Sequence, residues 1–105
     1  MKRFDVYHNG DTGTQRRLPY LLVLQSELLD EFPTRVVAPL VRVKDLGGSP
    51  LTLLNPSFEI EGRNMVMFTQ QLAGVSKRYL TRFVCSVDPE RDTILRALDF
   101  LFSGI

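Results

Sequence analysis

The stretch VDPERDTILRALDFLFSGI, residues 87–105, carries the clearest secondary-structure signal in the chain. Its apolar side chains recur at the i, i+3/i+4, i+7 spacing of an amphipathic helix: Ile94, Leu98, Leu101, Phe102 and Ile105. Asp88 is predicted to be the N-cap and Pro89 the first helical residue, because both types are favoured there. Gly104 is predicted to end the helix. The pattern therefore predicts one C-terminal helix with an apolar stripe.

One aromatic residue of this stretch lies outside the stripe. Phe100 stands between Asp99 and Leu101, so the helix is apolar on more than one side. Such a helix needs two surfaces to pack against. We expect the first to be the chain's own sheet and the second to be another copy of the chain in a C2 homodimer.

The sequence before the helix consists mainly of short predicted strands. Apolar runs bounded by glycine, proline or charged residues mark them at 4–8, 20–25, 35–43, 51–54, 57–60, 65–70 and 78–87. Pro39 cannot donate to a ladder, so we expect it at a sheet edge or bulge. Gly62 is predicted to form the turn of a hairpin. Many short strands followed by one helix predict a mainly β, α+β fold or small barrel.

Length and composition restrict the class of protein. The 105 residues predict a single domain spanning 1–105, and 44% hydrophobic residues exclude disorder as the default. A formal net charge of +1 gives no global field that would steer the chain to nucleic acid or anionic lipid. Cys85 is the only cysteine, so an internal disulfide is impossible. With no membrane-length apolar run and no signal-peptide pattern, the sequence predicts a cytoplasmic protein that is not bound to a membrane.

Motifs for catalysis and metal binding are missing from the sequence. There is no GxxxxGK[ST], GxGxxG, CxxC or HExxH, so we predict no metal, no cofactor and no catalytic residues. His8 is the only histidine and lies in a strand pattern, where a structural role is the usual one. The sequence therefore predicts a protein that is not an enzyme.

Several segments together resemble the CcdB toxins of toxin–antitoxin systems. They are FDVYHN (4–9), LVLQSELLD (22–30), RVVAPL (35–40), IEGRNMVMFTQQLAGV (60–75) and ILRALDFLFSGI (94–105). Among them, the block from Gln25 to Asp30 is the most specific single motif. The segments follow one another in the order and at the spacing of the family, and the resemblance covers essentially the whole chain.

The resemblance implies a fold and a function. The implied fold is an SH3-like small β-barrel with an extra antiparallel sheet and a C-terminal helix, assembled as a homodimer. The implied function is a toxin that binds the GyrA subunit of DNA gyrase and traps the gyrase–DNA cleavage complex. A flexible CcdA-like antitoxin would neutralise it, and operator DNA would be contacted only indirectly, through that antitoxin as co-repressor.

The resemblance also implies roles for individual residues. For gyrase binding it implies Leu28, Leu29, Arg91, Asp92, Arg96, Asp99, Ser103, Gly104 and Ile105. For the dimer interface it implies Leu98, Leu101, Phe102 and Ile105. For antitoxin binding it loosely implies His8, Asn9, Lys44 and Asp45, in the loops at 8–13 and 44–48.

Two departures from the family pattern keep alternatives open. Family members often end Trp-Gly-Ile, whereas this chain has Ser103 before Gly104, and Arg96 stands where a small amide is common. One alternative is therefore a drifted homologue that binds antitoxin without poisoning gyrase. The other is an endoribonuclease toxin of the MazF type, which has the same barrel and would use Arg82 with Thr81.

Overall fold

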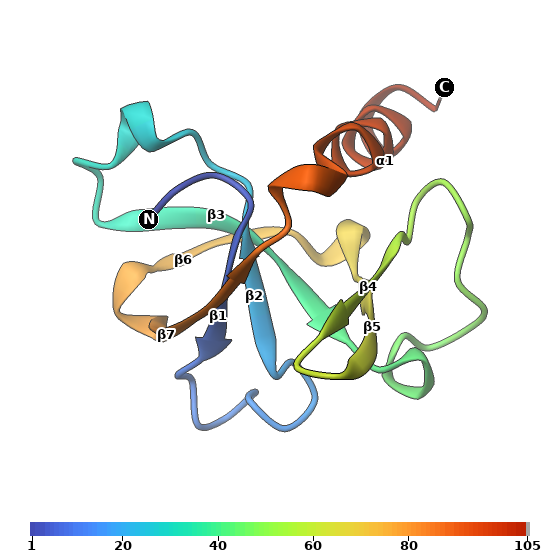
Figure 1. The fold of residues 1–105 in the computed structure, drawn as a ribbon, viewed down its shortest axis with the longest axis horizontal. Helices are drawn as coiled ribbons and strands as arrows, with labels where there is room; N and C mark the ends of the chain where they lie inside the picture. The colour runs from blue at the N-terminus through green and yellow to red at the C-terminus, as the bar shows by residue number, and fades with distance from the viewer. Residues whose placement is uncertain (105) are drawn as a thin grey trace.

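The computed structural model describes residues 1–104, and its main feature is a curled antiparallel sheet of seven strands (Figure 1). The strands are β1 Asp5–Asn9, β2 Tyr20–Val23, β3 Thr34–Val41, β4 Ser57–Ile60, β5 Arg63–Met67, β6 Ala73–Ser76 and β7 Leu80–Ser86. Helix α1 spans Arg91–Ser103. Single 3₁₀ turns are η1 Glu27–Leu29, η2 Val43–Asp45, η3 Thr69–Gln71, η4 Lys77–Tyr79 and η5 Asp88–Glu90.

Strand β3 organises the sheet. The strand order is β4-β5-β3-β2-β1-β7, and β6 pairs with the first half of β3. The end of β3 pairs with β5 instead, through Leu40 and Val41. The sheet consequently curls into a half-barrel, to which the β4–β5 hairpin is added at one end. This arrangement confirms the prediction of a mainly β, small-barrel fold with a C-terminal helix.

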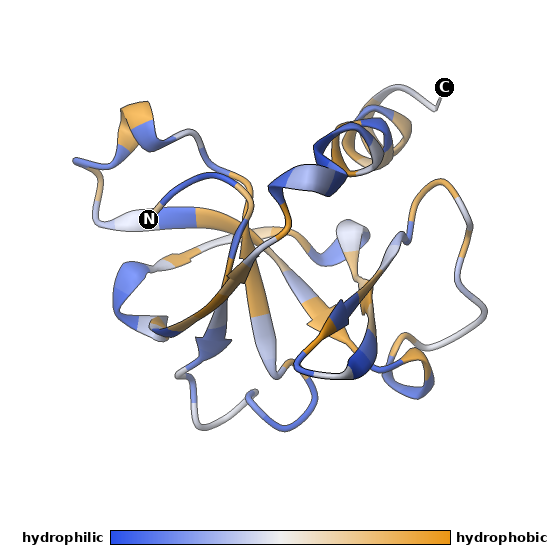
Figure 2. Cartoon of the chain, viewed as in Figure 1, coloured by the Kyte–Doolittle hydropathy of each residue, from blue (hydrophilic) through white to orange (hydrophobic). Residues whose placement is uncertain are grey.

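The central strands are buried on both faces. In β2, Tyr20 and Leu22 enter the main core, whereas Leu21 and Val23 enter a second core on the opposite face. Side chains alternate across a strand, so a continuous apolar run is what burial on two faces requires. Figure 2 shows apolar colouring over much of β2 and over the later part of β3, whose first residues are polar.

Pro39 lies neither on an edge strand nor at a bulge of the β2–β3 ladder, the two positions that the sequence suggested. It is inside β3, opposite Leu21 of β2. On its other side, the partner of β3 changes from β6 at Val37 to β5 at Leu40. The Pro39 carbonyl there accepts a hydrogen bond from Phe68 N–H at 2.9 Å. In a strand, the N and the carbonyl of one residue point to the same side, so the missing N–H of Pro39 faces this side. A residue without an N–H is tolerated there because neither β5 nor β6 pairs with Pro39.

The segment on either side of Pro56 is only partly as predicted. Residues 51–54 form turns instead of a strand, with Leu51 and Leu53 exposed and Leu54 buried. The hairpin that follows is confirmed, since Ile60 pairs with Arg63 across a two-residue turn. Both turn residues have positive φ, 52° at Glu61 and 77° at Gly62. That geometry suits the right-handed twist of a two-residue hairpin.

Helix α1 begins differently from the prediction. Asp88 is not an N-cap, because its carboxylate pairs with the Arg91 guanidinium at 2.5 Å. The chain enters α1 through η5, where the Asp88 N–H donates to Ser86 Oγ at 3.1 Å. The C-terminal prediction is confirmed: Gly104 adopts φ 74° and its N–H donates to the Phe100 carbonyl at 2.9 Å.

Only part of the predicted helical stripe is covered by the chain itself. Ile94 and Ala97 are fully buried in the main core, and Leu98 packs against it. Phe102, which we expected to be partly core, is instead 74% exposed in the single chain. Ile105 lies outside the described residues. Among residues 1–104, no helix is long and apolar enough to cross a membrane.

Candidate functional site

The outer face of α1 presents four of the predicted gyrase-binding residues. Asp92, Arg96, Asp99 and Ser103 are all exposed and recur every three or four positions, which places them on one side of the helix. Within residues 1–104, none of the three charged side chains makes an ion pair or a hydrogen bond. Their charges are therefore available to a partner.

Beside this face lies an apolar groove between α1 and η1. It has a volume of about 320 Å³, and its walls include Leu29, Leu98 and Phe102. Val36 of β3 and Leu72 contribute to its walls as well. The structure thus brings one predicted gyrase-binding residue, Leu29, together with two predicted dimer residues, 69 and 73 positions further along the chain.

The Gln25–Ser26 motif holds η1 at the rim of this groove. Gln25 Oε1 accepts from Val36 N–H at 3.1 Å, while its Nε2 donates to the Leu29 carbonyl at 3.1 Å. Ser26 Oγ caps η1 by accepting from Leu28 N–H at 3.2 Å. These bonds leave the Leu28 side chain 87% exposed, although it is apolar. The position of the leucine pair thus depends on the two polar residues before it.

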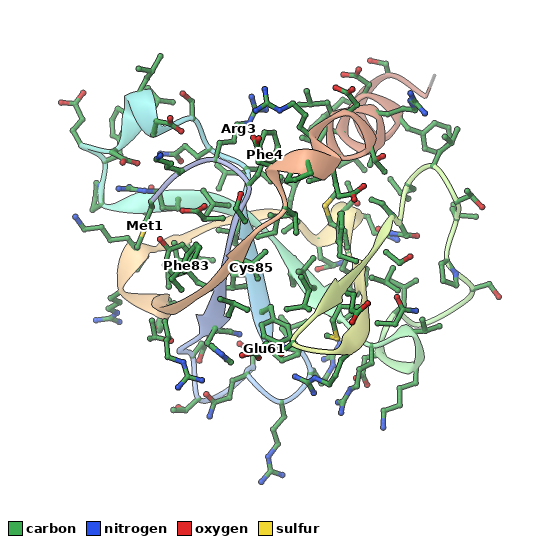
Figure 3. The ribbon with its side chains drawn as sticks, in the orientation of Figure 1. Met1, Arg3, Phe4, Glu61, Phe83 and Cys85 are labelled. Carbon is green, nitrogen blue, oxygen red and sulfur yellow. The ribbon has the colours of Figure 1, made fainter. Side chains whose placement is uncertain are left out.

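Arg91 and Leu101 differ from the other predicted residues. Arg91 is paired with Asp88, and its guanidinium lies 5.9 Å from the centre of the Phe4 ring. It lines a separate cavity beside the N-terminal segment, where Arg3 and Phe4 lie next to the start of α1 (Figure 3). Leu101 is half-buried and is not part of the groove. Gly104 is exposed at the end of the described helix.

The residues predicted to bind antitoxin belong to two loops that are linked. The Asn9 side chain is buried and braces its own loop, because Nδ2 donates to Thr14 Oγ1 and to the Leu18 carbonyl. Asp45 pairs with Arg42 at 2.9 Å, and Lys44 lies beside it in η2. Arg42 also donates to the Arg16 carbonyl at 3.2 Å, which connects the two loops. Asn9 is thus a structural residue in this chain.

His8 belongs to a polar cluster at the end of the sheet away from α1. Its Nε2 is 3.0 Å from Arg82 Nη2 and 3.5 Å from Glu61 Oε2. Tyr20 donates to Glu61 Oε1 at 2.6 Å and accepts from Arg63 at 2.8 Å. Figure 3 shows Glu61 at this lower end. The cluster joins β1, β2, β7 and the β4–β5 hairpin.

Hydrogen bonding and charge set the protonation of this cluster. The Tyr20 hydrogen bond lowers the pKa of Glu61 below its ordinary value, and the charges of His8 and Arg82 act in the same direction. Burial raises the pKa of Tyr20.

Sequence reasoning did not bring His8 and Arg82 together, since 74 positions separate them. A β-bulge aligns them: Tyr7 faces Phe83 and Asn9 faces Leu80, so His8 alone opposes both Thr81 and Arg82. One feature of the sequence fits a close approach of these two strands: a glycine, Gly10, directly follows the first of them. In the structure, a Cβ at Gly10 would lie 2.2 Å from Thr81 Cγ2.

The curled sheet and the terminal helix together define a small barrel-fold protein whose helix presents an exposed, charged face. The family model described as the CcdB protein matches residues 3–104. The chain therefore belongs to the CcdB family, whose members are toxins of toxin–antitoxin systems. No curated protein matches the chain.

Proposed function

We propose that this toxin acts without catalysis, by binding the GyrA subunit of DNA gyrase and trapping the gyrase–DNA cleavage complex. The observation that carries the proposal is the continuous surface formed by the outer face of α1 and the adjoining groove. Unpaired charges at Asp92, Arg96 and Asp99 stand beside apolar side chains at Leu29 and Phe102. Such a mixture of a charged rim and exposed aromatic and aliphatic anchors is typical of protein interfaces.

The same proposal assigns a homodimer as the active form. Phe102 is 74% exposed in the single chain and borders the groove, so a second copy would remove a large aromatic surface from water. A C2 axis near the ends of the two helices would also place both outer faces on one side of the assembly. A flexible antitoxin covering that side would neutralise the toxin in the cytoplasm and co-repress its operon.

Supercoiled DNA, purified gyrase and the full-length toxin provide the test. We expect linear DNA to accumulate when gyrase is denatured in the presence of toxin. Arg96→Ala should reduce the trapped fraction about tenfold or more, the loss expected when a charged interface contact is removed. The matched control is Glu59→Gln, an exposed charge change on β4 that lies outside α1 and does not line the groove, and it should leave trapping unchanged.

The same assay separates this proposal from the drifted-homologue alternative. A folded toxin that binds an antitoxin but produces no linear DNA would support the drifted homologue and contradict gyrase poisoning. A pull-down with the GyrA dimerisation core distinguishes loss of binding from loss of trapping. Ser103, in place of the aromatic residue that is frequent in the family, is the first position to restore as Ser103→Trp if trapping is weak.

One observation favours the endoribonuclease alternative. His8 contacts Arg82 and Thr81, which places an imidazole, a side chain that can carry a proton, beside a cation. Purified toxin incubated with single-stranded RNA would then release fragments, and Arg82→Ala would stop the cleavage. Intact RNA with the natural chain removes this alternative.

A further inference from the structure

A buried arginine lies at the start of β3, outside the apolar cores and outside the proposed gyrase-binding surface. Arg35 is only 3% exposed. A guanidinium stays charged, so its burial costs free energy unless it is paired and its N–H groups find acceptors. Among residues 1–104, the Asp30 carboxylate is its ion-pair partner, 3.3 Å from Nε and itself 41% exposed. The other acceptors around the guanidinium therefore decide what this residue does.

Those acceptors are backbone carbonyls of the loop between η1 and β3. Arg35 Nη2 donates to the Asp30 carbonyl at 2.7 Å, and Nη1 donates to the Thr34 carbonyl at 2.8 Å and to the Phe32 carbonyl. Asp30 is the C-cap residue of η1. A planar fork of donors can serve several fixed carbonyls at once, which a lysine ammonium cannot match in geometry. The guanidinium thus closes the loop and fastens the C-terminal end of η1.

The turn η1 depends on such contacts from outside. It has three residues, and none of them is buried. A single 3₁₀ turn has too few internal hydrogen bonds to be stable alone. Gln25 fastens it from the preceding strand and Arg35 from the following one. The two side chains share an acceptor, since the Thr34 carbonyl also lies 3.4 Å from Gln25 Nε2.

The burial of Arg35 excludes a direct contact with a partner. Side chains alternate along a strand, and the next residue, Val36, is the one that lines the groove. Any effect of Arg35 on binding must therefore pass through η1. Core stability alone does not explain a charge here, because replacing a buried ion pair by apolar residues is often neutral or stabilising.

We propose that Arg35 is a positioning residue for gyrase binding, which holds Leu28 and Leu29 in the exposed arrangement that meets GyrA. Leu28 is 87% exposed and Leu29 46%, so neither is held by packing in the core. A turn fixed before contact loses less entropy on binding. The inference rests on the proposed function for the identity of the partner, whereas the effect of Arg35 on η1 is independent of it.

The first test is NMR relaxation of the full-length toxin without gyrase. Arg35→Lys keeps the charge and removes the fork. We expect the backbone order parameters of Leu28 and Leu29 to fall from rigid values of about 0.85 to below about 0.6, with those of β2 unchanged. A role in the core alone would lower the stability of the whole fold without this local change. Arg17→Lys, at an exposed position, is the matched control and should leave η1 rigid.

The second test is a double-mutant cycle on binding to the GyrA dimerisation core. Leu28→Ala should weaken binding by the natural chain about tenfold or more. Arg35→Lys should also weaken it about tenfold, because the binding-competent position of η1 is then populated only in part. Both changes act through one contact, so adding Leu28→Ala to Arg35→Lys should cost less than about threefold further. Arg17→Lys should bind as the natural chain does.

Unchanged order parameters in η1 of Arg35→Lys, or fully additive losses in the cycle, overturn the proposal. If Arg35→Lys does not fold, Arg35→Met replaces it, since methionine keeps an unbranched side chain without the charge. Failure of both variants to fold would assign Arg35 to folding alone and overturn the proposal as well. A natural chain that does not bind the GyrA core would instead refute the proposed function, and the order parameters would still show whether Arg35 positions η1.

Discussion

At the scale of single residues, Gly10 shows how one missing side chain allows a site to form. The Thr81 methyl occupies the space that a Cβ at position 10 would need, with a separation of 2.2 Å. Thr81 in turn donates to the His8 carbonyl and stands beside Arg82 in the bulge. The identity of residue 10 therefore affects the position of two polar side chains on another strand.

We predict that Gly10→Ala destabilises the fold by about 1–3 kcal/mol, the usual cost of forcing extra volume into a packed contact. Adding Thr81→Ser should recover most of this loss, because serine keeps the hydroxyl and removes the clashing methyl. Urea unfolding measures both. Gly48→Ala, where a Cβ meets no atom within 4 Å, is the control and should change stability little.

A second residue-scale prediction concerns Glu61. Its pKa is lowered in the folded chain, chiefly by the Tyr20 hydrogen bond, so folding favours the charged form. The stabilisation is present above the ordinary glutamate pKa and is lost as the pH falls through the lowered value. Tyr20→Phe should therefore cost more stability at pH 7, where the Glu61 carboxylate accepts the hydrogen bond, than at pH 3.

Urea unfolding of the natural chain and of Tyr20→Phe at the two pH values checks this expectation. Glu61→Gln serves as the comparison, since it removes the titrating group itself. An equal loss for Tyr20→Phe at pH 7 and pH 3 would show that its hydroxyl contributes independently of the Glu61 charge.

At the scale of elements, α1 has two unequal faces. Ile94 and Ala97 anchor the helix on the main core, whereas Asp92, Arg96, Asp99 and Ser103 remain in solvent. This division separates the part of the helix that keeps the chain folded from the part that we propose to contact gyrase. Substitutions on the two faces should accordingly have different effects.

Ile94→Ala should destabilise the protein by about 2–5 kcal/mol, because it opens a cavity under the helix at a fully buried position. Thr93→Ala, one position earlier and exposed, should change stability by no more than about 0.5 kcal/mol. Thermal or urea unfolding monitored by circular dichroism gives both values. Similar losses for the two variants would contradict the buried position of Ile94.

At the scale of the whole molecule, the single chain leaves an aromatic side chain uncovered. Phe102 is 74% exposed at the mouth of the groove formed with Leu29 and Leu98. In the proposed homodimer this side chain would be buried against the second copy. The groove would then be an interface that the monomer leaves incomplete.

Light scattering coupled to size-exclusion chromatography tests this expectation. The natural chain should elute with twice the mass of the 12.0 kDa protomer, and Phe102→Ser should shift it toward the monomer. Phe32→Ser is the control, because Phe32 is also exposed but does not line the groove. A monomeric natural chain at high concentration would refute the homodimer.

Local sequence patterns were sufficient for much of the fold. The helix, its glycine end and the hairpin at Gly62 depend on contacts within a few residues, so their patterns were readable. Pro39 was misplaced because its surroundings are set by two strands, β5 and β6, that come much later in the chain. Asp88 was misjudged because its carboxylate has a competing partner in Arg91.

By itself, the sequence determined the mainly β class, the terminal helix and the exposed charges on its outer side, because periodicity and glycine positions act locally. Only the tertiary structure decided that Leu29 meets Phe102 and that His8 meets Arg82 and Glu61. The latter meeting depends on one extra residue in a bulge of β7. Because side chains alternate along a strand, that residue changes which of them face His8, and no local pattern records it.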